Sequence, residues 1–240
     1  MDHKDCFIDF HTHILPNMDD GAPDSPTSAK MLEQLKQQGV KTVVLTPHFY
    51  TDRENLADFL ERRAAAFQLL APIAEQLELE VVPACEMYFT DYIFNYENIS
   101  ALCVNSGKYL LTELPFSCRF SEAMFDRISR LIGTLNVIPI LAHIERYPQL
   151  LKDKECLYRL IDMGCLAQIN LNSLTDGFLQ RRTLLGFIRE DLVHVVGTDC
   201  HNLTTRAPQY QNGIQVIRKK LSGEFVENLM NNSLRIIQGQ

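Results

Sequence analysis

The sequence predicts an α/β fold in which strands and helices alternate and the strands form a parallel sheet. Three observations support this prediction. Short apolar runs rich in β-branched residues recur about every 30 residues, the length of a βα unit. The segments between them carry apolar residues at i, i+3 and i+4, which is typical of amphipathic helices. Several runs are apolar almost throughout, as expected for parallel strands that are buried on both faces.

Seven segments have this strand character: 6–10, 41–46, 80–84, 109–114, 137–142, 166–170 and 192–198. The helical pattern is clearest at 56–77 and 124–135. Ser25 and Pro26 predict the N-cap and first residue of an earlier helix, and Gly39 predicts its end. Ser121 predicts the N-cap of the helix at 124–135. Seven such units can close into a barrel or stay open as a doubly wound sheet, and spacing alone does not decide between the two.

Composition indicates one ordinary globular domain over residues 1–240. The apolar fraction is 46% and the charged fraction 22%, which exclude a disordered chain and a coiled-coil rod. No linker or change of composition divides the sequence. No apolar run approaches the roughly 20 residues that span a bilayer, so we expect no membrane insertion. The residues before His11 are too few for a secretory hydrophobic region, which predicts a cytoplasmic protein.

Charge and cysteine content reduce the number of function classes that fit the sequence. The chain has 23 basic and 30 acidic residues, a formal net charge of -7, and no basic run longer than three residues. A chain of this charge gains little from a nucleic-acid backbone, so we expect no nucleic-acid partner. The seven cysteines include no C-x-x-C pair, which favours reduced thiols in a cytosol over disulfides or a zinc knuckle.

Ionisable side chains occur where six of the seven predicted strands end. They are His11, His13, His48, Glu86, Glu113, His143, Asp199 and His201. The carboxyl ends of parallel strands meet at one edge, where ligands and catalytic groups gather. Side chains two residues apart on a strand point the same way, which pairs His11 with His13 and Asp199 with His201. Imidazole and carboxylate without thiolate favour Mn, Fe, Zn or Mg, so the sequence predicts a polynuclear metal site.

Three further acidic positions lie close to these strand ends. Asp9 is interpreted as the partner of an imidazole N–H within the metal site. One carboxylate of the Asp19–Asp20 pair is close enough in sequence to reach a metal ion. Glu145 is expected to orient Arg146 or to face solvent.

Four sequence blocks resemble the polymerase and histidinol phosphatase (PHP) superfamily. Specifically, they are similar to its capsule-type CpsB/CapC manganese-dependent protein-tyrosine phosphatases. The blocks are Asp9-Phe10-His11-Thr12-His13, Asp19-Asp20-Gly21, His143-Ile144-Glu145-Arg146-Tyr147, and Asp191-Leu192-Val193-His194 through Asp199-Cys200-His201-Asn202. The resemblance covers essentially the whole chain, although residues 87–106 fit the family pattern less clearly.

This resemblance implies a distorted TIM-like (β/α)7 barrel that holds three divalent metal ions, in the first place Mn²⁺, with Fe, Zn or Mg as alternatives. By this resemblance, one ion is held by His11, His13, Glu86 and Asp199. Glu86 bridges to a second ion, which Glu113 and His143 complete. The third ion is held by Asp20, His48 and His201. Arg146 and Arg206 match the phosphate-binding arginines of the family, since a planar guanidinium suits bidentate phosphate binding.

The activity implied by the resemblance is hydrolysis of phosphotyrosine by a metal-activated water. The implied partner is the tyrosine-rich tail of a bacterial tyrosine kinase that controls capsule or exopolysaccharide synthesis. Three other functions stay open: a histidinol-phosphate or other small phosphomonoester phosphatase, a metal-dependent nuclease, and a non-catalytic domain that binds a kinase tail. The sequence identifies neither the general acid for the leaving group nor the oligomeric state.

A thiol mechanism is a further alternative. Cys200 and Arg206 are separated by five residues, as in the C-x5-R loop of cysteine-dependent tyrosine phosphatases. The intervening segment has no glycine, although a cradle of backbone N–H groups for phosphate usually needs one. Strand alternation also points Cys200 away from Asp199 and His201. The sequence therefore favours the metal-dependent mechanism.

Overall fold

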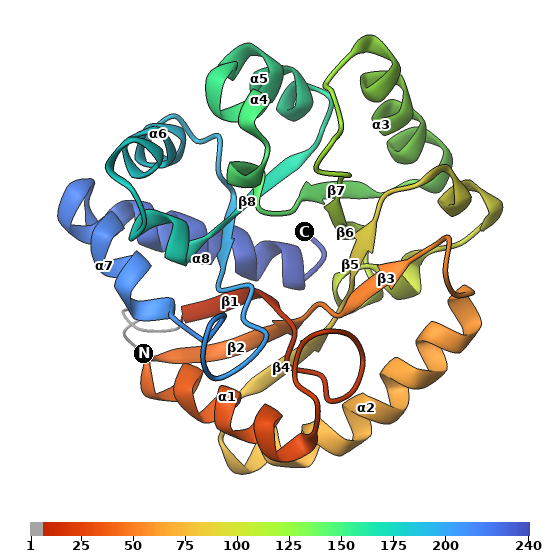
Figure 1. The fold of residues 1–240 in the computed structure, drawn as a ribbon, viewed down its shortest axis with the longest axis vertical. Helices are drawn as coiled ribbons and strands as arrows, with labels where there is room; N and C mark the ends of the chain where they lie inside the picture. The colour runs from red at the N-terminus through yellow and green to blue at the C-terminus, as the bar shows by residue number, and fades with distance from the viewer. Residues whose placement is uncertain (1–6) are drawn as a thin grey trace.

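The computed structural model describes residues 7–240 and confirms an α/β fold with parallel strands (Figure 1). The strands are β1 (Phe7–Thr12), β2 (Val40–Leu45), β3 (His48–Tyr50), β4 (Glu80–Pro83), β5 (Glu86–Tyr88), β6 (Tyr109–Glu113), β7 (Ile138–Leu141), β8 (Leu166–Asn170) and β9 (Val195–Gly197). The α-helices are α1 (Ser25–Gln37), α2 (Leu56–Gln76), α3 (Glu122–Leu135), α4 (Pro148–Lys152), α5 (Lys154–Asp162), α6 (Phe178–Arg189), α7 (Tyr210–Lys220) and α8 (Gly223–Ile237).

Each of the seven predicted strand segments contains a strand, although residue 6 lies outside the described residues. The sequence did not predict β3 and β5, which continue the paths of β2 and β4 after short breaks. Pro47 lies in the first break, where it cannot donate a backbone hydrogen bond. In the second break, the carbonyl of Ala84 accepts a 2.9 Å hydrogen bond from the buried guanidinium of Arg63 on α2.

The strands form two parallel sheets, one in the order β1-β2-β4 and one in the order β3-β5-β6-β7-β8-β9. Isolated contacts join the two sheets at their edges. The amide of Asp199 donates to the carbonyl of His11 at 2.8 Å, and the amide of His13 donates to the carbonyl of Cys200 at 3.0 Å. The first and last strands therefore meet at their carboxyl ends, although no continuous ladder joins them within residues 7–240.

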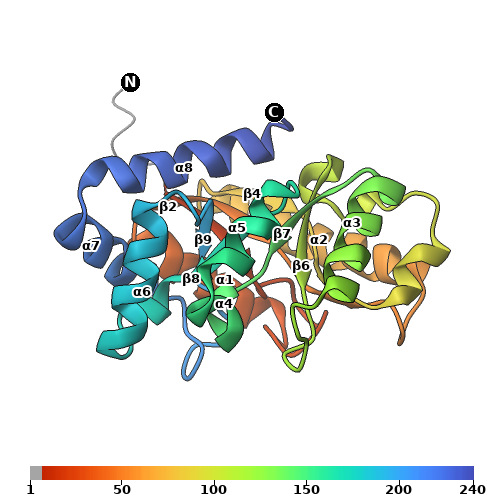
Figure 2. The same cartoon turned by 90° about the horizontal axis from the view of Figure 1, so that it is seen from above.

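Helices surround the strands, and α8 lies across one end of them (Figures 1 and 2). The larger apolar cluster lies between strands and helices. A second cluster is formed mainly by strand residues together with two residues of α8, and it includes Ile8, Phe10, Val44, Leu111, Ile140, Val195, Ile236 and Ile237. The interior is thus apolar toward α8, and the ionisable residues occupy the carboxyl ends of the strands. Every helix in the described part of the chain is too short or too polar to cross a membrane.

The helix-end predictions are confirmed in part. The N-cap of α1 is Asp24 rather than Ser25, because the Asp24 side chain accepts a 2.8 Å hydrogen bond from the amide of Thr27. Gly39 follows the end of α1 with φ +87°, as predicted for a residue that needs the left-handed region. Ser121 occupies the N-cap position of α3 in extended backbone, but its side chain makes no capping hydrogen bond.

Two helical glycines should respond oppositely to alanine. Gly133 in α3 has no neighbouring atom within 4 Å of an added Cβ, so Gly133→Ala should raise the free energy of unfolding by about 0.5–1 kcal/mol. At Gly213 in α7, an added Cβ would lie 2.6 Å from the backbone oxygen of Leu171. Gly213→Ala should therefore lower the free energy of unfolding by about 1–3 kcal/mol. Urea unfolding checks both variants, and equal stability of the two would contradict the packing of α7.

Candidate metal centre

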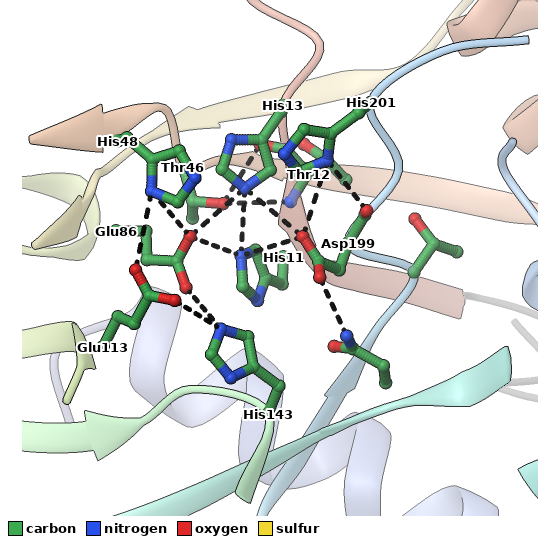
Figure 3. Close-up of polar contacts among 12 residues, drawn as sticks. His11, Thr12, His13, Thr46, His48, Glu86, Glu113, His143, Asp199 and His201 are labelled. Atoms are coloured by element: carbon green, nitrogen blue, oxygen red, sulfur yellow. Dashed lines mark hydrogen bonds and ion pairs between the residues drawn. The ribbon is translucent and has the colours of Figure 1, made fainter. Parts of the chain in front are cut away.

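The structure brings all nine sequence-predicted metal ligands together at the carboxyl ends of the strands. Figure 3 shows eight of them, all except Asp20. They come from β1, the loop after β1, β3, β5, β6 and the segments after β7 and β9. We call this set the candidate metal centre: His11, His13, Asp20, His48, Glu86, Glu113, His143, Asp199 and His201. All are buried or half-buried except Asp20, whose side chain is 67% exposed.

Four of these side chains surround one point. The Nε2 atoms of His11 and His13 lie 3.1 Å apart. Glu86 Oε2 lies 3.1 Å from the first nitrogen and 3.3 Å from the second. Asp199 Oδ1 completes the group, 3.6 Å from His11 Nε2 and 3.4 Å from His13 Nε2. Two imidazole nitrogens and two carboxylate oxygens therefore face a common centre.

A second group lies beside the other oxygen of Glu86. His143 Nε2 is 2.9 Å from Glu86 Oε1 and 3.4 Å from Glu113 Oε1. His48 Nδ1 contacts the first oxygen instead, at 3.1 Å from Glu86 Oε2. Glu86 therefore contacts both groups, which is the geometry that a bridging carboxylate requires.

The third group lies at the outer edge of the candidate metal centre. Asp20 Oδ1 is 3.3 Å from His201 Nε2 and 3.7 Å from His48 Nε2. His13, Asp20, His48 and His201 each offer one donor atom, and these atoms lie within 4.8 Å of one another. The exposure of Asp20 leaves this group the most accessible of the three to solvent.

Backbone strain occurs at two of the ligand positions. His143 has φ +35° and Asp199 has φ +53°, in the left-handed region that costs a residue with a Cβ about 1 kcal/mol or more. Each residue lies two positions after the end of a strand, β7 or β9, and redirects the chain there. This conformation places each side chain over the strand ends instead of along the strand.

Burial and opposite charges shift the pKa values of these groups strongly. Burial alone would raise the pKa of Glu86, but the charge of His11 and hydrogen bonds from three histidines hold it well below its usual range. Burial opposes a charge on His143, yet hydrogen bonds to Glu113 and Glu86 raise its pKa to about 10. Burial and then the charge of His13 lower the pKa of His201 to about 3. Protonated imidazoles thus compensate the buried acids, and a bound cation would take over that role, since ligating imidazoles are neutral.

Asp19 fixes the orientation of His13. Its Oδ2 lies 2.7 Å from His13 Nδ1 and accepts a 2.8 Å hydrogen bond from the amide of His48. When the proton of His13 is on Nδ1, its Nε2 is unprotonated, and the lone pair of that nitrogen can bind a metal ion at the centre. Of the neighbouring acids, Asp19 therefore orients a candidate ligand, and Asp20 belongs to the candidate metal centre. The sequence indicated that one of them could reach a metal but not the role of the other.

A buried amide chain supports three strand ends and was not predicted. Gln168 Oε1 lies 3.2 Å from His11 Nδ1 and accepts a 2.7 Å hydrogen bond from the amide of His143. Gln168 Nε2 donates to Asn170 Oδ1, and Asn170 Nδ2 donates to Asp199 Oδ2, both at 2.9 Å. Asn170 thus lines the site as a polar residue. Two amides at alternate positions of an otherwise apolar strand were the signal available in the sequence.

Two predicted contacts are wrong. Asp9 does not contact an imidazole N–H; it accepts hydrogen bonds from the amide and hydroxyl of Thr198 at 2.8 and 2.6 Å. It lies too deep along β1 to reach the rings, and burial raises its pKa to about 7. Glu145 neither orients Arg146 nor faces solvent. It is buried and accepts hydrogen bonds from the amide of Asn170 and the hydroxyl of Ser173.

A pocket of about 320 Å³ opens over the candidate metal centre. Both predicted phosphate-binding arginines line it. Arg206 Nη2 donates to Asp199 Oδ1 at 2.8 Å, and Arg146 Nη1 lies 3.9 Å from Asp199 Oδ2. Both side chains are more than a third exposed, so their guanidinium groups are accessible from the pocket. The pocket therefore combines a floor of imidazoles and acids with cationic groups at its edge.

The donor set fits divalent metal ions. The buried atoms His48 Nδ1 and His201 Nε2 have no hydrogen-bond partner among the residues described, although each lies close to a carboxylate oxygen. Buried polar atoms are normally paired, so unpaired ring nitrogens beside carboxylate oxygens are the arrangement that bound cations would satisfy. Imidazole nitrogen and carboxylate oxygen are ligands for first-row divalent ions, and no thiol belongs to the set.

The thiol alternative has no support in this geometry. Cys200 is fully buried and belongs to the apolar cluster between strands and helices. Burial raises the pKa of its thiol far above the usual range, so the nucleophilic thiolate is strongly disfavoured. The five-residue spacing between Cys200 and Arg206 therefore does not form a phosphate loop.

A parallel α/β fold with such a cluster at the carboxyl ends of its strands defines a class of protein with a candidate polynuclear metal centre. A family model described as capsular polysaccharide synthesis, CpsB/CapC, matches residues 7–238. The chain belongs to this CpsB/CapC family, and the resemblance seen in the sequence is confirmed.

Individual relatives match over nearly the whole chain. The tyrosine-protein phosphatase CpsB of Streptococcus pneumoniae is 32% identical, over 97% of this chain and 99% of that protein. The tyrosine-protein phosphatase YwqE of Bacillus subtilis strain 168 is also 32% identical, over 97% of this chain and 92% of its own length. A crystal structure from work on YwqE and CpsB, described as unique metal-dependent tyrosine phosphatases, matches with a TM-score of 0.80 and 30% identity, over 98% of this chain and 95% of that one.

Divalent ions should stabilise the folded protein. A ligand that binds only the folded state adds about 2.7 kcal/mol at 100 times its dissociation constant, so chelation should lower the Tm and Mn²⁺ should restore it. Scanning calorimetry with and without chelator measures this shift. Glu113→Gln should reduce the Mn²⁺-dependent shift, whereas Glu155→Gln on the exposed face of α5 should retain it. Equal shifts in both variants would contradict the assignment of Glu113 to the centre.

Gln168→Met should weaken metal binding without removing any ligand. Loss of the acceptor for His11 Nδ1 and the His143 amide frees both groups to reorient, and comparable losses around metal sites cost about 10–100-fold in affinity. Titration calorimetry with Mn²⁺ measures the change. Gln211→Met, at an exposed position of α7, is the matched control. A Gln168→Met protein that folds and binds Mn²⁺ like the control would show that the amide chain has no role in positioning.

Proposed function

We propose that this protein is a metal-dependent protein-tyrosine phosphatase, a phosphoric monoester hydrolase. The observation that carries the proposal is the convergence of nine imidazole and carboxylate side chains, six of which line one pocket together with Arg146 and Arg206. The names of the relatives CpsB and YwqE, tyrosine-protein phosphatases that match over nearly the entire chain, support the substrate class.

The three groups of donors support a three-ion centre, with Mn²⁺ the first choice and Fe, Zn or Mg the alternatives. In this proposal the first ion is held by His11, His13, Glu86 and Asp199. The second is held by Glu86, Glu113 and His143, and the third by Asp20, His48 and His201. When bound, such ions supply positive charge for the phosphate group and make water acidic enough to act as a nucleophile near neutral pH.

The side chains of the protein have separate roles around the phosphate. Arg146 and Arg206 bind its oxygens, because two planar guanidinium groups at one edge of the pocket can each donate two hydrogen bonds. Asp199 holds Arg206 in place through the 2.8 Å hydrogen bond. Negative charge that develops on the phosphate during displacement is stabilised by the same arginines. A tyrosine leaving group has a pKa near 10, so it depends less on a general acid than an alkyl alcohol does.

We propose that the substrate is a phosphotyrosine protein, the tyrosine-rich tail of a bacterial tyrosine kinase linked to capsule or exopolysaccharide synthesis. The family description supports the link to capsular polysaccharide, and the tyrosine-phosphatase names support the phosphorylated residue. A mobile tail suits a pocket that opens at the protein surface, since an extended segment can insert one side chain without unfolding its own domain. A cytoplasmic location is part of this proposal, since the free cysteines in the described chain suit a reducing compartment.

We also propose that residues 1–240 form one domain, in which the two sheets act as a single distorted (β/α)7 barrel. The paths of β2–β3 and β4–β5 each continue across both sheets, which leaves seven strand positions. The contacts of His11 and His13 with Asp199 and Cys200 bring the first and last positions together.

The alternative is a phosphatase for histidinol phosphate or another small phosphomonoester, because the same donors and arginines would bind any phosphate dianion. Metal-loaded protein should hydrolyse phosphotyrosine peptides with a far higher kcat/KM than histidinol phosphate, and chelation should abolish turnover. The reverse preference would establish the small-molecule alternative. Absence of turnover on both substrates would favour a non-catalytic binding domain.

Two variants separate the metal and thiol mechanisms in the same assay. Glu86→Gln removes one negative charge from the carboxylate that contacts two donor groups, so kcat should fall by about 1000-fold or more. Cys200→Ala should keep kcat within about threefold of the wild type, because the buried thiol does not contact the pocket. A loss of several orders of magnitude in Cys200→Ala, with its metal content intact, would reverse the assignment.

A further inference from the structure

The rim of the pocket is aromatic. Beyond the charged floor, Tyr50, Tyr88 and Phe116 line the same cavity as the candidate metal centre. Phe116 is 47% exposed, although most phenylalanines of this protein are buried. Tyr50 and Tyr88 are half-buried on the neighbouring strands β3 and β5. Exposed aromatic surface inside a polar pocket is unfavourable in water and therefore suggests a ligand that covers it.

Phe116 is fixed directly beside the donors of the centre. Its ring lies 5.7 Å from the ring of His143 and 5.8 Å from the buried ring of Tyr147, measured between centroids. The guanidinium of Arg146 lies 4.3 Å from the centre of the Phe116 ring. A group bound by Arg146 is therefore within reach of the aromatic surface of Phe116, and the contact between the two side chains orders both of them.

The two tyrosines form a second aromatic surface in the same pocket. The ring centroids of Tyr50 and Tyr88 are 5.6 Å apart, and Tyr50 lies 5.2 Å from the ring of His48. The guanidinium of Arg53 lies 4.3 Å from the centre of the Tyr50 ring. Tyr88 belongs to the segment 87–106, which fits the family pattern less clearly than the rest of the chain.

We propose that Phe116, together with Tyr50 and Tyr88, binds the aromatic ring of an aryl phosphate and makes the site selective for aryl over alkyl esters. This inference rests on the proposed phosphatase function and adds the residues that recognise the leaving group. With the phosphate held between the floor and the arginines, its ester substituent points toward the rim, where these rings lie. An aromatic substituent would remove water from exposed ring surface, which an alkyl group of two or three carbons does only in part. Aromatic pairs add roughly 2- to 10-fold in affinity beyond area burial.

The test uses phosphonates, which cannot be hydrolysed and so report binding apart from the reactivity of the leaving group. Phenylphosphonate and methylphosphonate are titrated by calorimetry into Mn²⁺-loaded protein. The wild type should bind phenylphosphonate more tightly, and Phe116→Ala should lower the ratio of the two affinities by roughly 2- to 10-fold. Because both ligands share the phosphonate group, any displacement of Arg146 changes both affinities and cancels in the ratio.

Two further variants make the test specific. Phe116→Tyr keeps the ring and should preserve the ratio of the wild type. Phe178→Ala removes a phenylalanine that is 66% exposed on α6 and does not line the pocket, so this variant should also preserve the affinity ratio. An unchanged ratio in Phe116→Ala, or an equal loss in Phe178→Ala, would overturn the inference. Such a result would leave the phosphatase proposal standing if phosphotyrosine peptides are still hydrolysed, whereas absence of hydrolysis in the wild type would refute that proposal whatever the ratios.

Discussion

The rest of the structure depends on the compensation of buried negative charge at one rim. Glu86, Glu113 and Asp199 are almost completely buried within a few ångströms of one another. Like charges at such distances disfavour ionisation unless positive charge lies between them. The surrounding imidazoles provide that charge through protonation, and divalent ions would provide it more effectively. The position of each strand end follows from this requirement, since every donor must face the same small volume.

Two features orient the donor side chains: backbone strain at two of the residues, and hydrogen bonds that hold two of the imidazole rings. Left-handed backbone at His143 and Asp199 costs stability locally and turns both side chains over the strand ends. Asp19 and Gln168 hold the outward nitrogens of two imidazoles, which directs the inward nitrogens to the centre. The apolar interior beneath offers no alternative hydrogen bonds to the ligands. Donor geometry is therefore set by groups that would not themselves contact a metal ion.

The sequence predicted which side chains converge at one edge, because their placement follows from local rules. A side chain at the carboxyl end of a parallel strand must lie at the common edge, and residues two apart share a face. Asp9 and Glu145 were misassigned because their partners, Thr198 and Asn170, are chosen by contacts far apart in the chain. The strands β3 and β5 were missed because three residues carry too little pattern. The connection between the two sheets was also not predictable, because it depends on a few hydrogen bonds between residues almost 190 positions apart.

The position of α8 has a consequence for how the chain reaches its native state. Ile236 and Ile237 complete the interior apolar cluster together with Ile8 and Phe10 of the first strand. Neither group is fully buried until the other is in place, so a nascent chain without α8 leaves the apolar strand residues of this cluster exposed to water. Contacts of such long sequence separation are slow to form. We therefore expect α8 to dock late in folding, and we expect its docking to be the step that excludes water from this apolar cluster.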